Sequence, residues 1–374
     1  MTIDESRLPF YALLSPEDLR VYEAATARGL FNVQPAEEFW RDHYEMLYRR
    51  GYQLRPRYDP DWTPSWIGTR ADPIFCEDSI ALVNRDVMDA TRREDGKLVC
   101  IKRIRSNEAE IDIALSLLTP DLIDHSMNHC VRILDAFKDS LQPETYLLVM
   151  PYLRPFDDPP FGAVGEVLDF VRQTLEGLCF IHSQNVAHRD CASENIMMDA
   201  TPLYPHGHHP IRRSSTVDGI YNAHPLSRID HPVNYYFIDF GISTRFALGE
   251  STMVVGAKGR EKGLPELSRT VKYNALQADI FILGNLYKHS LLEKYSSLDF
   301  LTPLIASMTK LDPSARPTAP NALSQFHVIR SNLSPLISRW RLRPREESVP
   351  QRIVYDTVAV ARETFHHLKK IVGQ

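Results

Sequence analysis

Apolar residues divide the chain into a strand-like region and a helix-like region. Short apolar runs rich in β-branched residues predict three strands, at residues 98–102, 130–134 and 146–150. Asn107 followed three residues later by Glu110 is typical of a helix start, so a helix is expected from 107 to about 118. After residue 163, apolar positions with helical spacing predict helices near 164–179 and 276–295. The pattern predicts an α+β fold, in which a small lobe of strands is followed by a large helical lobe.

Residues 1–72 are rich in proline, tryptophan, tyrosine and charge. One helix is expected there, over residues 35–50, because its apolar residues form a stripe and a glycine follows it. The stretch 52–66 contains three prolines and should run extended, with Trp62 and Trp66 as anchors. We expect residues 1–72 to form a docking arm that covers a core, in preference to a separate binding module.

A second segment interrupts the helical region. Residues 200–234 are polar and rich in proline, histidine and serine, which predicts a loop insertion. Its histidines His206, His208 and His209 have no matching cysteine or carboxylate pattern. We therefore interpret them as loop residues in preference to a metal site.

Residues 331–374 combine a basic segment with an amphipathic pattern. Arginines alternate with other residues from 339 to 345. Apolar residues then repeat at spacings of four and three, at Val354, Val358, Ala361, Phe365, Leu368 and Val372. This spacing predicts an amphipathic helix, and packing on the core is its expected role. Binding of a partner helix and contact with an anionic membrane are the alternatives, and membrane contact is the less favoured one.

The composition limits the classes of function. The chain has 374 residues, 43% hydrophobic and 24% charged, and its net charge of −5 argues against a nucleic-acid-binding protein. Its five cysteines form no paired motif, which favours reduced thiols. The N-terminus lacks the basic start of a signal peptide, and no apolar run approaches the ~18 residues of a membrane span. We expect a soluble, intracellular protein, either cytoplasmic or nuclear.

Two motifs carry the candidate chemistry. Residues 188–195 are His-Arg-Asp-Cys-Ala-Ser-Glu-Asn, and residues 239–241 are Asp-Phe-Gly. In this order they resemble the HRDxxxxN and DFG motifs of the eukaryotic protein kinase family. The flanks, including residues 37–42 and 54–57, resemble kinase-like proteins from fungi.

This resemblance implies a two-lobed protein kinase-like fold over residues 73–330. A small antiparallel-sheet N-lobe would occupy 73–150, and a large helical C-lobe would occupy 151–330 and contain the insertion at 200–234. The implied activity is transfer of the γ-phosphoryl group of ATP to a hydroxyl of a protein substrate, with Mg²⁺.

The resemblance also implies roles for individual residues. Asp190 would accept the proton of the incoming hydroxyl. Asn195 and Asp239 would bind Mg²⁺, which prefers hard oxygen ligands. Lys102, which ends the run Val-Cys-Ile-Lys, would hold the α- and β-phosphates of ATP. Lys102, Asp190 and Asn195 are thus the expected catalytic residues.

The remaining nucleotide contacts follow from the same resemblance. An acid on the helix after Lys102 should pair with it; Glu110 is the expected partner and Glu108 the alternative. Three residues between the lobes are implied to contact adenine: Met150, Tyr152 and Leu153.

Further matches lie in the helical region. Residues 264–266 resemble the APE motif, with Arg316 as the expected partner of its glutamate, and Asp279 matches the residue that braces the catalytic loop. Two hydroxyl residues of the segment 239–266 are candidate phosphorylation sites with Arg189 as partner: Ser251 and Thr252.

Two departures from the family pattern support an alternative function. Residues 80–86 contain no glycine where the family has a glycine-rich loop over the phosphates. Ala192 replaces a lysine that is usual in Ser/Thr kinases, which removes positive charge near the transferred group. The alternative is a pseudokinase that acts as a scaffold or allosteric binding module. Retention of all the expected catalytic and metal residues favours the enzyme, with Ser/Thr and Tyr both open as acceptors and the oligomeric state unspecified.

Overall fold

The structure is a computed structural model that describes residues 3–105, 108–353 and 355–356. The chain forms two compact units. The sheet unit comprises Met1–Glu108, Arg132–Leu153 and Ala200–Leu226. The helical unit comprises Ala109–Val131, Arg154–Asp199 and Ser227–Gln374. The predicted two-lobed α+β fold class is confirmed, although residues 109–131 and 200–226 group differently from the predicted boundaries.

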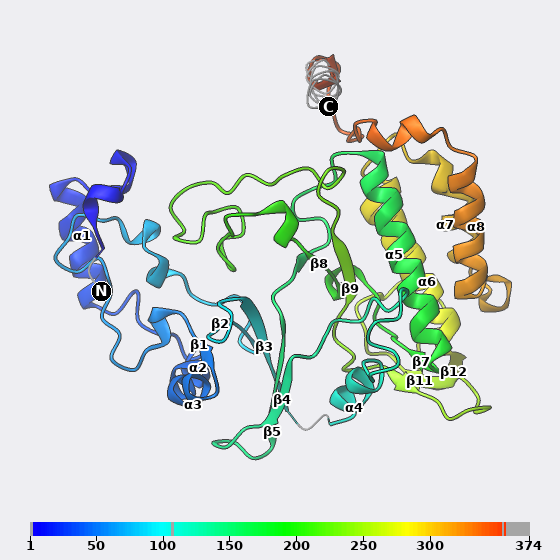
Figure 1. The fold of residues 1–374 in the computed structure, drawn as a ribbon, viewed down its shortest axis with the longest axis horizontal. Helices are drawn as coiled ribbons and strands as arrows, with labels where there is room; N and C mark the ends of the chain where they lie inside the picture. Colours follow the sequence, from blue (N-terminus) through cyan, green and yellow to red (C-terminus); the bar gives the residue numbers. More distant parts are fainter. Residues whose placement is uncertain (1–2, 106–107, 354, 357–374) are drawn as a thin grey trace. The chain divides into compact units, whose positions relative to one another are not determined.

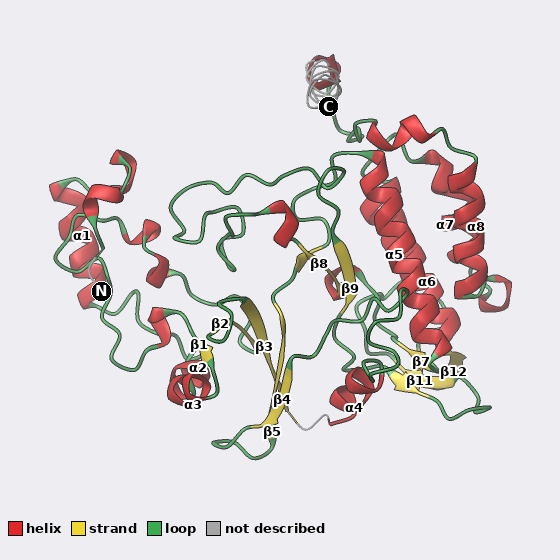
Figure 2. Cartoon of the chain, in the orientation of Figure 1, coloured by secondary structure: helices red, strands yellow, loops and turns green. Residues whose placement is uncertain are grey.

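Five antiparallel strands form the sheet, in the order β1-β2-β3-β5-β4 (Figure 2). Their bounds are β1 Tyr52–Gln53, β2 Val87–Arg92, β3 Leu98–Arg105, β4 Asp135–Lys138 and β5 Thr145–Pro151. The predicted strands at 98–102 and 146–150 correspond to β3 and β5. The strand predicted at 130–134 is wrong, because pairing with β5 starts only at Leu134, whose N–H donates to the Val149 carbonyl at 2.8 Å.

One face of this sheet is covered by residues of the N-terminal segment. The residues of β2 to β5 on that face are Met88, Ala90, Val99, Ile101, Phe137, Leu147 and Val149. They pack against Phe39, Trp40, Leu47, Tyr52, Leu54 and Tyr58. Because side chains alternate along a strand, Asp89, Cys100 and Lys102 lie on the opposite face. The N-terminal segment therefore supplies both the cover and the edge strand β1.

The prediction of one continuous helix over residues 35–50 is wrong. The segment forms α2 (Glu38–Asp42) and α3 (Tyr44–Arg49), separated by His43, whose backbone is not helical at φ −97° and ψ 1°. The buried His43 ring holds this break: Nδ1 lies 2.6 Å from the Phe39 carbonyl, and Nε2 lies 2.7 Å from the Asp139 carboxylate. The tertiary contact with Asp139 thus overrides a locally helical pattern.

The N-terminal segment also contains α1 (Pro16–Ala27), which the apolar pattern does not predict. Only Ala25 of this helix is buried, with Leu19 and Tyr22 half-buried, so its apolar positions are few. The usable signal is its cap, because the Ser15 hydroxyl accepts the N–H of Asp18 at 3.2 Å and Pro16 takes the first helical position.

Glu37 is the polar centre of the N-terminal segment. It is 1% exposed, and its carboxylate accepts hydrogen bonds from Arg57 (2.8 and 2.9 Å), the Tyr58 hydroxyl (3.0 Å) and the N–H groups of Gln34 (2.8 Å) and Leu82 (3.3 Å). Burial alone would raise the pKa of Glu37, but the hydrogen bonds and charge of Arg57 outweigh it, so this pKa lies below its usual 4.5.

The helical unit is built on α5 (Val164–Ser183), where a long helix is predicted. The other helices are α4 Glu108–Ser116, α6 Ala275–Tyr287, α7 Thr302–Met308 and α8 Ala319–Ser331. α5 packs against α8, and α6 packs against α7 (Figure 1). The helix predicted over 276–295 is shorter, because a π-helical turn at Lys288–Leu292 follows α6.

Short strand pairs hold the two motifs of the helical unit. β6 (Arg154–Pro155), β8 (Ile196–Asp199) and β9 (Asn234–Phe237) form one antiparallel sheet. β7 (Val186–Ala187) pairs with β10 (Thr244–Arg245), and β11 (Met253–Gly256) pairs with β12 (Ser268–Asn274). The 188–195 loop therefore connects β7 to β8, and residues 239–241 follow β9.

The basic segment near the C-terminus is neutralised inside the helical unit. Its four arginines form ion pairs, Arg339 with Asp230, Arg341 with Glu347 and Asp356, Arg343 with Asp356, and Arg345 with Asp299. The apolar positions of the predicted amphipathic helix, Val354 to Val372, lie outside the described residues. Within the described ranges, no helix is both long enough and apolar enough to span a membrane.

We predict that Glu37→Gln lowers the free energy of unfolding by about 3 kcal/mol, because it leaves the buried Arg57 guanidinium without its charged partner. The control Glu45→Gln should change it by no more than about 0.5 kcal/mol, since Glu45 and Arg49 form an exposed pair at 3.6 Å. Urea denaturation measures both variants.

The Glu37 contribution should also depend on pH. A carboxyl with a lowered pKa in the folded protein stabilises it above its unfolded pKa, and this stabilisation is lost as the pH falls through the folded pKa. The difference between wild type and Glu37→Gln should therefore shrink below the ordinary Glu value of 4.5. A difference that grows on acidification contradicts this account.

Candidate active site

A buried carboxylate from α6 fixes the backbone of the 188–195 loop. Asp279 accepts the N–H of His188 (2.8 Å) on one oxygen and the N–H of Arg189 (2.6 Å) on the other. It also lies 3.0 Å from Nε2 of His182 on α5. Arg189 adopts φ +66°, a left-handed conformation that is unfavourable for a residue with a side chain. The two hydrogen bonds to Asp279 therefore offset a local backbone cost.

The His188 ring is a second tie between the loop and the segment that carries Asp239. Its Nε2 lies 3.0 Å from the Ile238 carbonyl, and its Nδ1 accepts the N–H of Asp190 at 3.3 Å. Burial lowers the pKa of His188, and the neighbouring Asp279 carboxylate opposes this only in part. A neutral ring that donates from Nε2 and accepts at Nδ1 matches these contacts.

Asp190 and Asn195 meet in this loop. Asn195 Nδ2 donates to the Asp190 carbonyl at 2.8 Å and to the Asp190 carboxylate at 2.9 Å. The other carboxylate oxygen of Asp190 accepts the N–H of Arg260 at 2.7 Å. The Asp190 side chain is 12% exposed. A carboxylate that is held rigidly and reached from solvent can accept the proton of a hydroxyl group.

Glu110 and Asp239 converge on Gly241. A Cβ atom at position 241 would lie 3.0 Å from Asp239 Oδ1 and 3.1 Å from Glu110 Oε2, so the backbone passes close to both carboxylates. Asp239 adopts φ +64°, and its Oδ1 accepts the Gly241 N–H at 3.3 Å. The helical unit thus brings the predicted Glu110 and Asp239 together, while the side chain of the alternative Glu108 is outside the described set.

Lys102 lies in the sheet unit. On β3 it pairs opposite Val87 of β2 and Leu148 of β5, and its side chain shares a sheet face with Cys100. Burial raises the pKa of Cys100 to about 12; the Asp89 carboxylate adds to this and the Lys102 ammonium group opposes it. This face of the sheet therefore mixes Asp89, Cys100 and Lys102 with the apolar residues paired opposite them, Val87, Leu148 and Met150, in contrast to the face that the N-terminal segment covers.

The predicted adenine-contact residues follow β5. Met150 is buried, and Tyr152 and Leu153 are half-buried. The Tyr152 N–H donates to the Leu98 carbonyl at 3.2 Å, and its hydroxyl donates to the carbonyl of Pro210 at 2.6 Å. The insertion is therefore attached to this segment through Pro210.

A buried polar cluster anchors the insertion to the sheet unit, and sequence reasoning does not find it. Arg55 lies 3.0 Å from Asp89 and 3.3 Å from Glu77, and His209 Nε2 lies 3.3 Å from the same Glu77 oxygen. Burial raises the pKa of Asp89, and the Arg55 guanidinium opposes this. The one sequence signal for this cluster is Asp89, an acidic residue within the β2 sequence. In the described part of the chain, no three His, Cys, Asp or Glu side chains gather as a metal site would require.

The segment that replaces the glycine-rich loop is held by other side chains. Trp40 Nε1 donates to the Arg85 carbonyl at 3.0 Å, and Glu37 accepts the N–H of Leu82. Arg103 binds the Asp86 carboxylate at 2.5 and 2.9 Å. The backbone of residues 80–86 is thus tied to the N-terminal segment and to β3.

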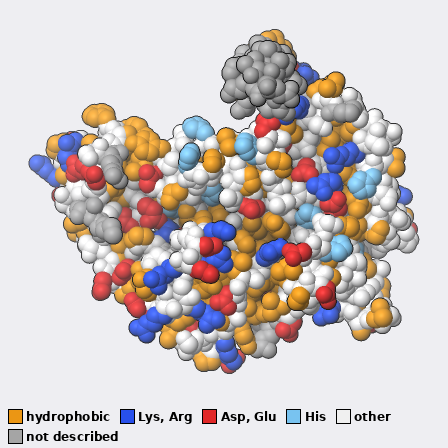
Figure 3. Space-filling model, in the orientation of Figure 1, with side chains coloured by type: hydrophobic (Ala, Val, Ile, Leu, Met, Phe, Trp, Pro, Cys, Tyr) orange, Lys and Arg blue, Asp and Glu red, His pale blue; other side chains and the backbone are white. Residues whose placement is uncertain are grey.

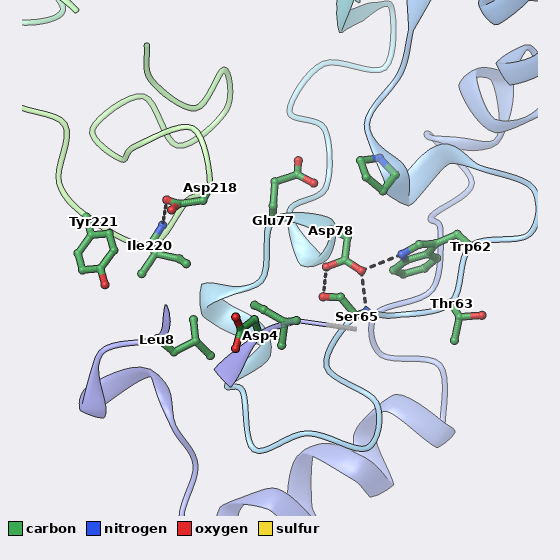
Figure 4. Close-up of a pocket in the computed structure, with 12 residues that line it drawn as sticks. Asp4, Leu8, Trp62, Thr63, Ser65, Glu77, Asp78, Asp218, Ile220 and Tyr221 are labelled. Carbon is green, nitrogen blue, oxygen red and sulfur yellow. Dashed lines mark hydrogen bonds between the residues drawn. The ribbon is translucent and has the colours of Figure 1, made fainter. Parts of the chain in front are cut away.

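Figure 4 shows a cavity of about 520 Å³ in the sheet unit. Residues of the N-terminal segment and of the insertion line it, among them Leu8, Trp62, Asp78, Asp218 and Ile220. Its carboxylates have partners within the chain: Asp78 accepts from Trp62 (2.9 Å), and Asp218 accepts the N–H of Ile220 (3.1 Å). The described residues that line the cavity include none of those predicted to contact ATP.

The Arg189 side chain is occupied by the segment that follows Asp239. Its guanidinium donates to the carbonyls of Ile242 and Val255 and to the hydroxyls of Thr244 and Tyr273, at 3.2 to 3.3 Å. The cation expected to meet a phosphate is thus already hydrogen-bonded, while phosphorylation of Ser251 or Thr252 stays a prediction.

The glutamate of the 264–266 motif lies where the resemblance implies. Arg316 binds both oxygens of Glu266, at 2.5 and 2.8 Å, and also donates to the Gln277 carbonyl at 2.9 Å. This bidentate pair fixes the end of the 239–266 segment to the start of α6.

A strand-rich unit and a helical unit that carries the 188–195 and 239–241 motifs define a protein of the protein kinase class. The family described as Protein kinase domain matches residues 85–294, which is more than half of the chain. The chain belongs to this family.

Three curated relatives share parts of this region. Protein-tyrosine kinase 6 of Homo sapiens is 36% identical over 72 residues, 19% of this chain and 15% of that protein. Maternal embryonic leucine zipper kinase of Danio rerio is 25% identical over 191 residues, 45% of this chain and 24% of that protein. Protein-tyrosine kinase 6 of Mus musculus is 34% identical over 95 residues, 25% of this chain and 19% of that protein. The chain spans less than a quarter of the length of each relative.

We predict that Asp279→Asn weakens the 188–195 loop, because an amide accepts on only one atom and leaves one of the two backbone N–H groups without a partner. The cost should be about 1–3 kcal/mol. Amide hydrogen exchange of His188 and Arg189 should speed up, while the control Asp218→Asn in the insertion leaves both amides protected. Unchanged exchange of these amides in Asp279→Asn contradicts the role of Asp279 in holding the loop.

Proposed function

We propose that this protein is an ATP-dependent protein kinase that transfers the γ-phosphoryl group of Mg-ATP to a hydroxyl group of a protein substrate. The observation that carries the proposal is the Asp190 carboxylate, hydrogen-bonded to Asn195 at 2.9 Å and 12% exposed within a loop whose backbone Asp279 holds. This arrangement suits chemistry at a hydroxyl group, whereas a binding module has no need of it.

In the proposed reaction, the hydroxyl oxygen of the substrate attacks the γ-phosphorus of ATP, and Asp190 accepts the proton of that hydroxyl. A new O–P bond forms, the bond to the β–γ bridging oxygen breaks, and ADP leaves. The clamp on the loop keeps the carboxylate in place, so little reorganisation is needed during the reaction.

The metal and nucleotide roles are part of the same proposal. Asn195 donates from Nδ2 to Asp190, so its Oδ1 would be a hard oxygen ligand, and the carboxylate of Asp239 would be the second. This donor chemistry fits Mg²⁺, which neutralises phosphate charge when bound. Lys102 would hold the α- and β-phosphates with Glu110 as its partner. The adenine contacts would come from Met150, Tyr152 and Leu153.

A pseudokinase that works by binding is the second candidate function. The tied backbone of residues 80–86 favours it, because the N–H of Leu82 already donates to Glu37. Ala192 favours it as well, since the loop lacks a cation there.

Calorimetric titration with ATP decides between these functions at the binding step. We expect magnesium-dependent binding, weakened about tenfold or more in Lys102→Ala and in Asp239→Asn, because each removes a charged contact to the phosphates or the metal. The control Lys97→Ala, at an exposed lysine beside the β2–β3 turn, should bind as wild type does. Absence of binding at millimolar ATP would remove the enzyme and leave the scaffold.

Transfer of labelled phosphate to a generic protein substrate tests the chemical step. Asp190→Asn should reduce transfer by about 100-fold or more with unchanged ATP affinity, because loss of a general base affects only the reaction. The control Glu194→Gln changes an exposed carboxylate of the same loop and should retain activity. Equal activity of wild type and Asp190→Asn contradicts the proposed role.

A further inference from the structure

Exposed basic side chains gather on the segment that precedes and forms β12. They are Lys258, Arg260, Lys262, Arg269 and Lys272. Across the described ranges, no ion pair joins Lys258, Lys262, Arg269 or Lys272 to a carboxylate. Of the two acids in the segment, Glu266 pairs with Arg316, and Glu261 keeps its charge while it accepts the N–H of Gly263 at 2.7 Å, so five cations stand against one acid. The segment therefore presents an excess of uncompensated positive charge.

This basic segment lies directly against Asp190. Gly259 adopts φ +110°, and a Cβ atom there would lie 3.2 Å from the Arg189 carbonyl and 3.4 Å from Asp190 Oδ1. The next residue, Arg260, donates its N–H to that same oxygen, and its guanidinium lies 3.8 Å from the other. The Arg260 side chain is nevertheless 51% exposed. The positive charge begins at the proposed catalytic carboxylate and continues outward along the chain.

The backbone that carries these cations is fixed. β12 pairs with β11, and the Tyr273 hydroxyl donates to the Gly256 carbonyl at 2.9 Å. Arg316 holds the segment through Glu266. Arg269 and Lys272 lie on β12 between its paired ends, Ser268 and Tyr273, where the register with β11 shifts.

The charge of this segment is a local property. On the face of the molecule shown in Figure 3, acidic and basic side chains are interspersed. The whole chain carries a net charge of −5. The segment with five exposed cations, of which Arg260 contacts Asp190, is therefore opposite in sign to the protein as a whole.

We propose that the protein substrate is an acidic segment, in which Asp, Glu or phosphorylated residues flank the acceptor hydroxyl and dock on this basic segment. The inference rests on the proposed function, since it places the hydroxyl at Asp190. One exposed ion pair changes an equilibrium by a factor of about 1.5 to 5, so two or three pairs give a preference of about tenfold. The preference should fall as salt screens the charges.

Peptides of equal length with a central Ser, Thr or Tyr test this preference when the flanks are all Glu, all Ala or all Lys. With full-length protein and Mg-ATP, kcat/KM for the Glu-flanked peptide should exceed that for the Ala-flanked one by about tenfold, mainly through KM. The Lys-flanked peptide should be the poorest. Equal kcat/KM for Glu and Ala flanks overturns the inference while leaving the proposed kinase function intact.

Charge reversal locates the effect. Lys262→Glu with Lys272→Glu should reduce the ratio of Glu-flanked to Ala-flanked turnover about tenfold, and Lys262→Gln with Lys272→Gln should reduce it less. The control Lys97→Glu, on the β2–β3 turn, should leave the ratio unchanged. A ratio that survives reversal of both lysines overturns the inference.

Binding measurements separate this inference from the reaction itself. Fluorescence anisotropy of the Glu-flanked peptide should show binding that weakens between low and high salt and in the Lys262→Glu, Lys272→Glu variant, even if no peptide is phosphorylated. That result would retain the acidic docking surface and reject the kinase activity. Binding of anionic vesicles or RNA through the same lysines, without binding of the acidic peptide, overturns the inference.

Discussion

The hydrogen bonds between Asp279 and the backbone of His188 and Arg189 are the constraint on which the candidate site depends. Asp279 stands 90 positions after Arg189 in the chain, yet it is buried under the loop and uses both oxygens there. Two backbone donors on one carboxylate stabilise a left-handed residue that would otherwise be strained. With this backbone fixed, Asn195 reaches Asp190 twice, and the His188 ring joins the loop to the segment that carries Asp239.

Buried charge organises the sheet unit in a comparable way. Glu37 joins Arg57 to the backbone at Leu82, and Glu77 joins Arg55 to His209 of the insertion. A buried ion pair adds little net stability over a well-packed apolar pair, but breaking one is costly. These clusters therefore act mainly by fixing position. They join the N-terminal segment and the insertion to the sheet unit. Residues 80–86, which stand where the family has a flexible glycine-rich loop, are held by the N-terminal segment.

The segment after Asp239 uses its charges in two different ways. The Arg189 guanidinium donates hydrogen bonds to four acceptors of the segment. These contacts hold the backbone near β11 without an added phosphate. The lysines and arginines from 258 to 272 are exposed instead, and among them Arg260 also lies 3.8 Å from the Asp190 carboxylate. The Arg189 hydrogen bonds hold the backbone of the segment. The exposed cations give it an excess of positive charge, which reaches Asp190 at Arg260. The proposed acidic substrate follows from this division.

The elements and motifs that depend on short-range pattern can be predicted from the amino-acid sequence alone. β3, β5 and α5 follow from local periodicity, and the candidate residues Asp190, Asn195 and Asp239 follow from two motifs of fixed spacing. Long-range contacts set where α2 ends and where β4 begins, which acids bind His43 and His209, and which groups accept hydrogen bonds from Arg189. These features rest on contacts between residues far apart in the chain, whose energies no local pattern records.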